Sequence, residues 1–344
     1  MNGLKLNQNQ FSDLINLNNK VFLPLINFVN KKDFETIIKK SLFNKKFFPY
    51  PIFFGVNKKN YIKYKNKKEL IFFYKSKIIA KVNNINFFQI NKKEFGIKIY
   101  GKNYKNHPYY KKFKSENYRF LNFDVKKIYK FKLDKSFFIS PDFFKKQNKK
   151  KKLASFHTRN VPHTAHQWIH KYLIKKYNSL LIQPLIGQYK LGEYKDNVII
   201  ELNKKIVKQY KNKNVFVIPF FSYPRYGGPR EASLHAIVRK NFGCSHFWVG
   251  RDHAGYKQFF KKYASQKFCK KITKKLKINI VAVKEPYYCS KKKFIVNQCS
   301  CKVSCKIPVS GSSIREMIKK NINIPSYLMS KKISKNLNKL SLIS

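Results

Sequence analysis

The sequence YGGPREASLHAIVRKNFGCSHFWVGRDHAG, residues 226–255, decides the fold of this chain. Pro229 is placed to open a helix, and Gly243 is placed to close it. The apolar run at 246–249 then predicts a short buried strand, which ends in a polar loop at 250–255. A helix that leads into a buried strand and a polar loop is typical of an α/β protein, so we expect a parallel sheet.

The same alternation continues on both sides of this stretch. Further strands are expected at 153–156, 181–185, 215–219 and 278–283, and further helices at 162–177, at 197–210 and from Gly255 onward. This order predicts a Rossmann-like α/β domain with helices on both faces of the sheet. Ligands of such domains bind in a crevice at the carboxyl ends of the strands, where most of the polar motifs fall.

A run of lysines separates this domain from the residues before it. The segment FFKKQNKKKK, residues 143–152, carries too much like charge to pack and predicts a linker or an exposed crossover. Before it, a β-rich domain that begins with helical segments is expected, with strands at 71–74, 78–82 and 95–100. We therefore expect three parts: the β-rich domain at 1–148, the parallel-sheet domain at 149–285 and a small C-terminal subdomain at 286–344.

The chain is strongly basic, with 75 Lys and Arg residues against 16 Asp and Glu and a formal net charge of +59. Such a charge is common in proteins that bind nucleic acid or anionic membranes. Here the lysines are scattered and accompany many Asn, Ile, Phe and Tyr residues, a pattern that an AT-rich genome explains. We therefore expect no specific nucleic-acid or membrane partner. At 215–256, however, four of the five basic residues are arginines, which indicates bidentate contacts to anions.

The sequence also indicates a soluble, cytoplasmic protein with reduced cysteines. No run of 18 apolar residues is present, and the N-terminal MNGLKLNQNQ lacks the apolar stretch of a signal peptide. The six cysteines are expected to be free, buried or metal-bound.

Four of the eight histidines lie in HTRNVPHTAHQWIHK, residues 157–171. Residues 158–160 would form the turn after a strand, and His163 and His166 would share one face of the first helical turn. A helix N-terminus offers free N–H groups and the positive end of the helix dipole, so this set predicts a phosphate site. The alternative is a pair of ordinary half-buried histidines that cap the helix. A metal pair is disfavoured because no carboxylate accompanies the two imidazoles.

Two further segments are expected at the same crevice. The glycines at 227–228 would let the backbone approach a ligand, and Arg230 in the first helical turn would need an anion beside it. The loop 250–255 would reach the same edge, although a glycine-rich turn with a surface ion pair is an alternative there. The segment VSGSSIR, residues 309–315, reads as a helix start whose hydroxyl groups and guanidinium can contact phosphate.

Taken together, these segments resemble ATP sulfurylase (sulfate adenylyltransferase). That family has the signatures Q-T-R-N-P-x-H-x-x-H, G-P-R-E-A leading into H-A-x-x-R-K-N-x-G-C-x-H-F-x-V-G-R-D-H-A-G, and I-S-G-T-x-I-R. The resemblance spans Leu153 to Met317, and the long middle block matches nearly letter for letter. The N-terminal part is similar to the family's PUA-like domain in length and position. Residues 96–103, GIKIYGKN, end in Asn where a phosphate-binding P-loop needs a hydroxyl, so no fused APS kinase is expected.

The resemblance implies the reversible reaction of ATP with sulfate to give adenosine 5′-phosphosulfate (APS) and diphosphate, without a covalent enzyme intermediate. It also implies Mg²⁺ with ATP and a homo-oligomer. The catalytic residues that it implies are Thr158, Arg159, Asn160, His163, His166 and Arg251. The implied ATP-binding residues are His157, Arg159, Asn160, Gly250, Arg251, Asp252, His253, Ser310, Ser312 and Arg315. The implied sulfate-binding residues are His157, Arg159 and Ala254.

A few positions depart from the family signatures. His157 stands where the family has Gln, which puts the affinity for sulfate and its pH dependence in question. On the next strand, the family's H-P-L-x-G appears as QPLIG at 183–187, and its following G-D appears as GE at 192–193. Ser312 stands where the family has Thr.

Cys289, Cys299, Cys301 and Cys305 fall within 17 residues, close enough in sequence for a tetrahedral metal site. Zinc-binding members of the family have C-x2-C-x8-C-x3-H. Alignment on that pattern puts Lys292 at the second ligand and Cys305 at the histidine, with Cys299 able to replace the missing ligand. Structural Zn²⁺ and a set of free thiols both stay open.

Two other functions also stay open. An adenylyltransferase with a different acceptor would explain His157. A basic nucleic-acid-binding protein on an inactive scaffold would explain the net charge, although the intact His163, His166 and Arg251 argue against it. The sequence does not decide whether the cell uses the reaction to activate sulfate or to make ATP from APS.

Overall fold

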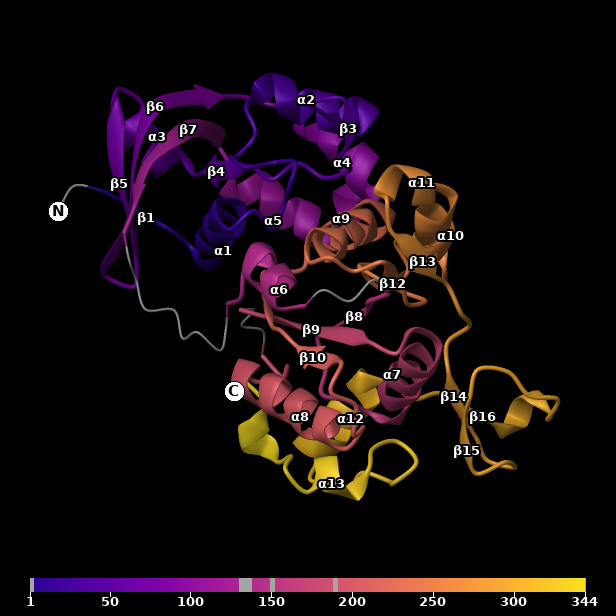
Figure 1. The fold of residues 1–344 in the computed structure, drawn as a ribbon. Coiled ribbons are helices and arrows are strands. Elements are labelled where there is room, and N and C mark those ends of the chain that lie inside the picture. The colour runs from indigo at the N-terminus through magenta and orange to yellow at the C-terminus, as the bar shows by residue number, and fades with distance from the viewer. Residues whose placement is uncertain (1–2, 130–137, 149–151, 188–190, 344) are drawn as a thin grey trace.

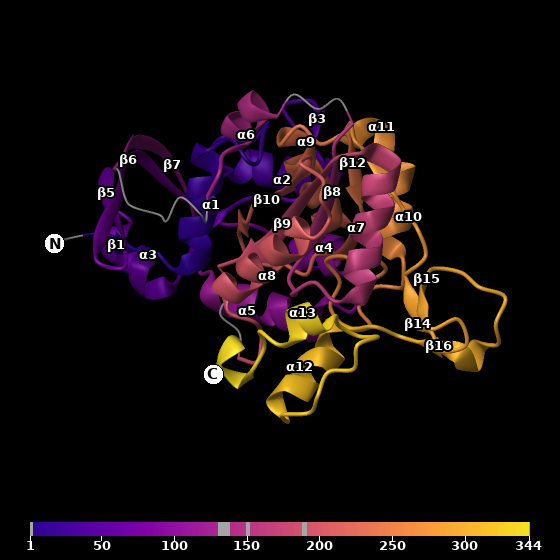
Figure 2. The ribbon, with the colours of Figure 1, turned by 60° about the horizontal axis from the view of Figure 1, so that its bottom comes forward.

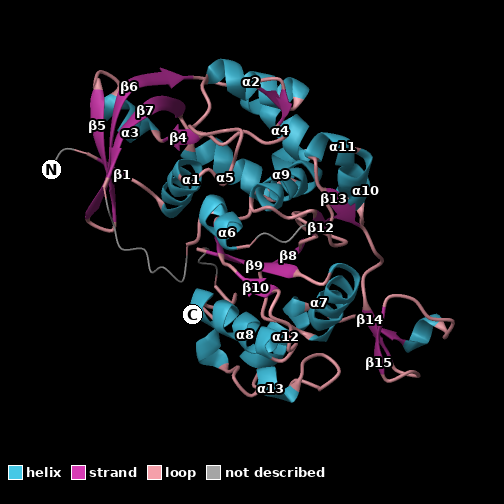
Figure 3. Ribbon diagram, viewed as in Figure 1, coloured by secondary structure: helices cyan, strands magenta, loops and turns pink. Residues whose placement is uncertain are grey.

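The computed structural model describes residues 3–129, 138–148, 152–187 and 191–343 (Figure 1). It confirms the expected α/β class, with a six-stranded parallel sheet in the middle of the chain. A five-stranded, mostly antiparallel sheet precedes it, and a small antiparallel sheet follows it (Figure 3). No helix within these ranges is long and apolar enough to cross a membrane.

The parallel sheet has a reversal in its strand order. Its strands are β8 (Ala154–Thr158), β9 (Leu180–Ile186), β10 (Val215–Val217), β11 (Phe220–Phe221), β12 (His246–Trp248) and β13 (Asn279–Val281). They follow the order β10-β9-β8-β12-β13, and β11 also pairs with β9. The order therefore reverses between β8 and β12, and such a reversal opens a ligand crevice at the carboxyl ends of the two strands.

Helices cover both faces of this sheet, as expected. One face carries α7 (Thr164–Tyr177) and α8 (Asp196–Lys208), and the other carries α9 (Gly228–Asn241), α10 (Ala264–Lys271) and α11 (Thr273–Leu276) (Figure 2). Helix α9 is enclosed between the sheet and the N-terminal domain: Leu234 and Val238 share one core with Phe247 of β12 and with Phe22. A helix buried on all sides carries no single apolar stripe, which is the pattern of α9.

The N-terminal domain is built on the second sheet, in the order β1-β5-β6-β7-β4. Its elements are β1 (Leu4–Lys5), α1 (Gln8–Asn18), α2 (Lys31–Lys40), β2 (Leu42–Phe43), β3 (Lys46–Phe47), β4 (Phe54–Val56), α3 (Lys58–Tyr64), β5 (Glu69–Tyr74), β6 (Lys77–Phe88), α4 (Lys92–Tyr100), α5 (Pro108–Glu116) and β7 (Arg119–Ile128), with a 3₁₀ turn at Tyr104–Asn106. Phenylalanine rings fill its core: Phe54 and Phe72 stack at 5.3 Å, and Phe123 meets both edge-on.

The C-terminal part packs against the parallel-sheet domain. Its elements are β14 (Tyr287–Cys289), β15 (Phe294–Val296), β16 (Lys306–Ile307), α12 (Gly311–Lys319) and α13 (Lys331–Ser334), with 3₁₀ turns at Val303–Cys305 and Lys339–Ser341. Ile314 and Ile318 of α12 are buried in one cluster with Ile199 and Leu202 of α8. This packing holds the segment 309–315 beside the parallel sheet.

The strand expected at 95–100 is wrong, because these residues end helix α4. The Asn91 side chain accepts a hydrogen bond from the Glu94 amide and caps the helix. Phe95 and Ile99, four residues apart, are both buried. Helical spacing of buried groups therefore outweighs the β propensity of this segment.

Two other expectations are corrected. The helix expected from Gly255 begins only at Ala264, and turns occupy the residues between. The charge run taken as a linker starts inside helix α6 (Pro141–Gln147), whose Phe144 is buried with its ring 5.4 Å from that of Phe216 and 6.2 Å from that of Phe242. The buried Phe144 thus holds the first part of the segment 143–152 against the protein. Residues 149–151 lie outside the described residues.

A buried ion pair joins the N-terminal domain to the parallel-sheet domain. Asp13 of α1 pairs with Arg225, which precedes α9, and the two side chains are only 2% and 4% exposed. The Tyr223 hydroxyl donates to the same carboxylate at 2.8 Å. Removal of one partner from such a pair leaves an uncompensated charge in the interior.

We expect Asp13→Asn to lower the free energy of unfolding by about 3–5 kcal/mol, because the guanidinium of Arg225 loses its buried counter-ion. Chemical denaturation followed by tryptophan fluorescence measures the change. The matched control is Asp142→Asn in the exposed pair with Lys145, at 3.0 Å, which should shift the value by less than about 0.5 kcal/mol. Equal effects of the two substitutions would contradict a structural role for the buried pair.

Candidate active site

Two segments meet at the reversal of the parallel sheet. The turn 158–163 leaves β8 and enters α7, and the segment 249–263 leaves β12. The first turn follows the predicted pattern: the Thr158 hydroxyl accepts a hydrogen bond from the Asn160 amide at 3.0 Å, and His163 caps α7. The N-terminus of α7 thus faces the carboxyl end of the sheet, where free N–H groups favour an anion.

His163 and His166 lie together at this helix start, as expected. Their rings stack with centroids 3.6 Å apart, and Nδ1 of His163 accepts a hydrogen bond from the His166 amide at 3.3 Å. Burial lowers the pKa of His166 to about 4 and holds the pKa of His163 well below its ordinary value. Nδ1 of His166 is buried with no partner among the described residues. Both imidazoles are therefore neutral near pH 7, and one has an unused polar atom.

The segment 309–315 reaches the same turn from the other end of the chain. A guanidinium N–H of Arg315 donates to Oδ1 of Asn160. A Cβ at Gly311 would lie 2.6 Å from the same oxygen, so only glycine fits this approach. Ser310 caps α12 by accepting a hydrogen bond from the Ser313 amide, and the Ser312 hydroxyl lies 3.3 Å from that of Ser310. The contact between Asn160 and Arg315 completes the turn.

Arg159 lies over a tyrosine at the mouth of the site. Its guanidinium donates to the Tyr226 hydroxyl and sits 5.2 Å from the centre of that ring. A carboxylate oxygen of Glu193 lies 4.0 Å from a guanidinium nitrogen of Arg159, and the Arg159 side chain is 37% exposed. Tyr109 of the N-terminal domain packs on Tyr226 at 4.0 Å. Because Arg159 is partly exposed, an anion can reach its guanidinium directly from solvent.

His157 is half-buried and belongs to a cluster of histidines and Arg239 on the face of the sheet covered by α9. Its Nδ1 lies 2.6 Å from a guanidinium nitrogen of Arg239, and its ring centre is 4.6 Å from that of His235 and 5.5 Å from that of His253. Nδ1 of His235 shares a hydrogen bond of 3.0 Å with Nε2 of His253. Burial lowers the pKa of His253 to about 3. The cluster is therefore neutral apart from Arg239.

The residue paired with His157 on the next strand also departs from the family pattern. The register of β8 and β9 sets Gln183 directly opposite His157. Gln183 is fully buried, and neither its amide nitrogen nor its amide oxygen has a partner among the described residues. The two departures thus stand side by side on one face of the sheet.

The loop after β12 carries Arg251 and Ala254. Arg251 pairs with Glu285 and, at 2.8 Å, with Asp252, and it lines a cavity of about 620 Å³ between this loop and the small C-terminal sheet. Ala254 has a left-handed backbone with φ of +57°. Its carbonyl accepts a hydrogen bond from the Gly228 amide at 2.8 Å, whereas its own N–H has no partner within the described ranges. The structure thus joins the loop to the start of α9 but does not bring Arg251 into contact with His163 or His166.

The arginines kept at 215–256 mostly have structural roles, which corrects the expectation of anion contacts. Arg230 donates to the carbonyl oxygens of Ile37, Ile38 and Pro49, so it satisfies the C-terminal end of helix α2. The carbonyl groups at the end of α2 therefore take the place of the anion that we expected beside Arg230.

The glycines at 227–228 pack closely against protein groups. A Cβ at Gly227 would lie 2.9 Å from Tyr50, and one at Gly228 would lie 2.5 Å from Phe260. Close packing therefore explains these two glycines.

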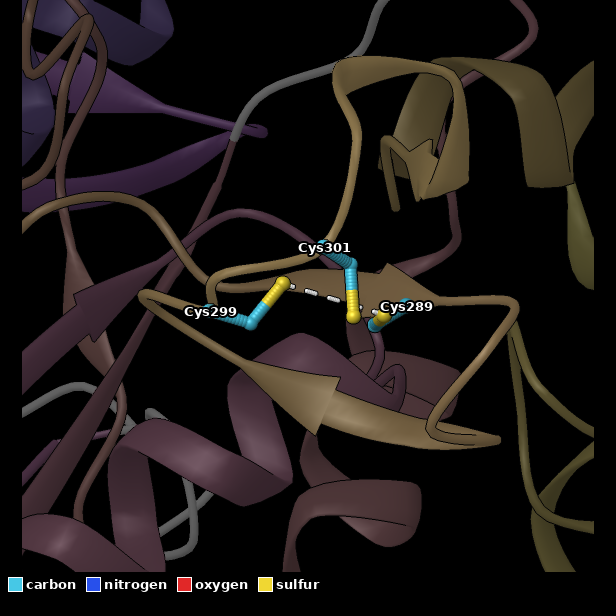
Figure 4. Close-up of side chains that lie close together, drawn as sticks. All are labelled: Cys289, Cys299 and Cys301. Carbon is cyan, nitrogen blue, oxygen red and sulfur yellow. Dashed lines mark hydrogen bonds between the residues drawn. The ribbon is translucent and has the colours of Figure 1, made fainter.

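Three of the four clustered cysteines come together in the C-terminal part. The sulfurs of Cys289, Cys299 and Cys301 all lie within 4.8 Å of one another, and Figure 4 shows them converging beside the small sheet. The Tyr287 hydroxyl lies 3.2 Å from Sγ of Cys299 and is the main cause that lowers the pKa of that thiol to about 7. The structure does not bring Cys305 into this group. Three converging thiols, one of them ready to ionise, fit three corners of a zinc site.

Several site residues carried no separate signal in the sequence. Tyr226, His235 and Arg239 all lie inside the quoted stretch, yet composition gives no reason to select them. The spacing of His235 and Arg239, four residues apart on one helix, was the one indication that both face the same strand.

Comparisons with known proteins agree with this geometry. The family model described as ATP-sulfurylase matches residues 141–340, and that of a PUA-like domain matches residues 1–128. A sulfate adenylyltransferase of Staphylothermus marinus is 31% identical, over 97% of this chain and 89% of the relative. One of Pyrococcus abyssi is 30% identical, over 92% of this chain and 85% of the relative.

Among solved structures, one described as a hexameric APS kinase from Thiobacillus denitrificans superposes with a TM-score of 0.73 at 14% identity. It covers 97% of this chain, which spans only 62% of that longer chain, and at this identity it supports the fold alone. The family-model match and the full-length relatives show that the chain belongs to the ATP-sulfurylase family.

Proposed function

We propose that this protein is a sulfate adenylyltransferase that converts ATP and sulfate to APS and diphosphate, reversibly. The contact between Arg315 and Asn160 is the observation that carries the proposal. It joins the turn after β8 to a segment more than 150 residues later in the chain, at the N-terminus of a helix. A guanidinium, two imidazoles and free N–H groups around one strand end suit a polyphosphate.

The chemistry needs no general base. A sulfate oxygen attacks the α-phosphorus of ATP, an O–P bond forms, and the bond from the α-phosphorus to the bridging oxygen breaks in line to release diphosphate. Sulfate is already deprotonated, so the barrier lies in bringing two anions together and stabilising the leaving group. Cations and oriented N–H groups supply that stabilisation. The substrate is ATP with Mg²⁺ bound to its phosphates.

Each predicted residue has a place in this proposal. His157, Arg159 and the free N–H of Ala254 would hold sulfate, and His163 and His166 would stabilise the α-phosphate and the departing diphosphate. The remaining ATP contacts would come from Thr158, Asn160, Gly250, Arg251, Asp252, His253, Ser310, Ser312 and Arg315. Arg251 would exchange Glu285 for a phosphate when ATP binds, because its ion pair is only partly buried.

Three broader statements belong to the same proposal. The chain is divided at 148/149 and 285/286, as the sequence predicts. Copies of the chain associate, which is in line with a structural relative that is described as hexameric. A cytoplasmic location stays a prediction from the sequence.

The test is synthesis of ATP from APS and diphosphate by the purified protein. ATP–diphosphate exchange with sulfate, with molybdate or without an acceptor then identifies the acceptor. Exchange that sulfate does not stimulate would favour a different acceptor. Folded protein that makes no ATP would exclude the proposed reaction.

We expect Arg251→Ala to lower kcat/KM by about 10²–10³, because a cation that stabilises the phosphates is lost. Arg251→Lys should recover part of the lost kcat/KM, since lysine keeps the positive charge but cannot make the two parallel hydrogen bonds of a guanidinium. The matched control is Lys204→Ala on the exposed side of α8, which should leave the rate unchanged. An unchanged rate in Arg251→Ala would remove this residue from the active site.

The affinity for ATP should increase as the pH falls from about 7 to about 5. His166 is neutral in the free protein with a pKa of about 4, and a bound triphosphate raises that pKa, so binding takes up a proton. His166→Gln should remove this dependence. Isothermal titration at each pH in both proteins separates the effect from protonation of ATP itself, and equal pH dependence in both would contradict it.

Zinc content tests the cysteine cluster. We expect about one Zn²⁺ per chain, held by Cys289, Cys299 and Cys301. Cys301→Ser should lose the metal, whereas Cys305→Ser should keep it, as measured by elemental analysis of the same preparations. Loss of zinc in both variants would make Cys305 the fourth ligand, and zinc-free native protein would leave a set of free thiols.

A further inference from the structure

A fully buried arginine lies next to His157. The guanidinium of Arg239 is 0% exposed and lies 5.0 Å from the ring centre of Phe220 and 5.5 Å from that of Phe247. One nitrogen donates to the His235 carbonyl at 3.3 Å, a second lies 2.6 Å from Nδ1 of His157, and Nε has no partner within the part of the chain that the structure describes. Among the described residues, no carboxylate forms an ion pair with Arg239. An acceptor that meets such a cation is held strongly.

This contact decides where the proton of His157 lies. A guanidinium has N–H donors and no acceptor, so Nδ1 of His157 offers its lone pair to Arg239. The proton of the neutral ring is then on Nε2. Protonation of Nδ1 would break the hydrogen bond and place two cations in contact. Burial, and after it the charge of Arg239, accordingly holds the pKa of His157 well below its ordinary value.

The other groups that face His157 reinforce this state. They are His235 of α9, His253 of the segment after β12 and Arg159 of the turn after β8. Arg159 and Arg239 are cations and the two imidazoles are neutral, so none of these groups offers a negative charge that would stabilise a protonated His157. Gln183, the neighbour of His157 on β9, is fully buried and has two unpartnered amide atoms. Gln183 therefore places beside His157 an amide whose polar atoms no described protein group uses.

We propose that Arg239 is a positioning residue of the acceptor site: it holds His157 as the neutral imidazole with its proton on Nε2. That N–H, with the Gln183 amide beside it, is what the acceptor oxyanion meets. The inference rests on the proposed function only for the identity of the oxyanion as sulfate. The charge of His157 therefore stays constant across neutral pH, whereas an ordinary histidine changes its charge at about pH 6.5.

The pH profile of the KM for sulfate tests this role. The wild-type value should stay level between about pH 6 and about pH 8.5. In Arg239→Met, the KM should fall toward the acid end, because His157 loses the neighbouring cation that opposes its protonation, although burial continues to oppose it. The double variant His157→Gln/Arg239→Met should be level again, although His235 and His253 remain. Arg239→Lys should resemble wild type. A level profile in Arg239→Met, or a slope kept in the double variant, would overturn the proposal.

A second measurement needs neither a stable Arg239 variant nor activity. The ¹⁵N shifts of the imidazole in the intact wild-type protein, assigned by difference with His157→Gln, distinguish the two neutral tautomers. We expect Nε2 protonated and Nδ1 unprotonated near about pH 7. A proton on Nδ1 would overturn the proposal. Protein that shows the expected tautomer yet makes no APS would leave the role of Arg239 intact and refute the proposed function.

Discussion

The burial of helix α9 on all sides is the constraint on which the rest of the structure depends. A polar side chain in such a helix has no access to water, so each one has to find a partner in the protein. Asn241 donates to the carbonyl oxygens of Val21 and Leu23 in the N-terminal domain. Glu231 accepts hydrogen bonds from the amides of Arg225 and Gly227 and shapes the turn before the helix.

The same constraint organises the crevice. His235 shares a hydrogen bond with His253 in the segment after β12, and Arg239 forms a hydrogen bond with His157 at the end of β8. One enclosed helix therefore connects the N-terminal domain, the loop after β12 and the strand that leads to α7. Its polar residues stabilise the arrangement and also determine which nitrogen of His157 is free.

The periodic parts of the fold could be predicted from the sequence, because their signals are local. The alternation that begins at 153–156, the caps of α7 and α12, and the proline at the start of α9 follow from residues a few positions apart. Residues 95–100 were assigned wrongly since β-prone side chains can also sit at helical spacing when Phe95 and Ile99 face a core. The late start of α10 was missed because no local signal distinguishes a turn held by distant contacts from a helix.

The candidate site was predicted only in part, for the same physical reason. The motifs name the turn after β8 and the start of α12, and in the structure Arg315 of α12 reaches Asn160 of that turn. The motifs cannot show which group is the ion-pair or hydrogen-bond partner of a given side chain. Arg225 and Arg230 look like ligands of an anion until the structure shows Asp13 and the end of α2 in that role. Their partners lie more than 180 residues away in the chain.

The reach of Arg315 to Asn160 has a consequence for biosynthesis. The turn after β8 leaves the ribosome before the side chain that completes it, because Arg315 follows Asn160 by more than 150 residues. A nascent chain that ends before α12 therefore lacks the contact that closes this turn. The proposed nucleotide site can thus be completed only after α12 has been made.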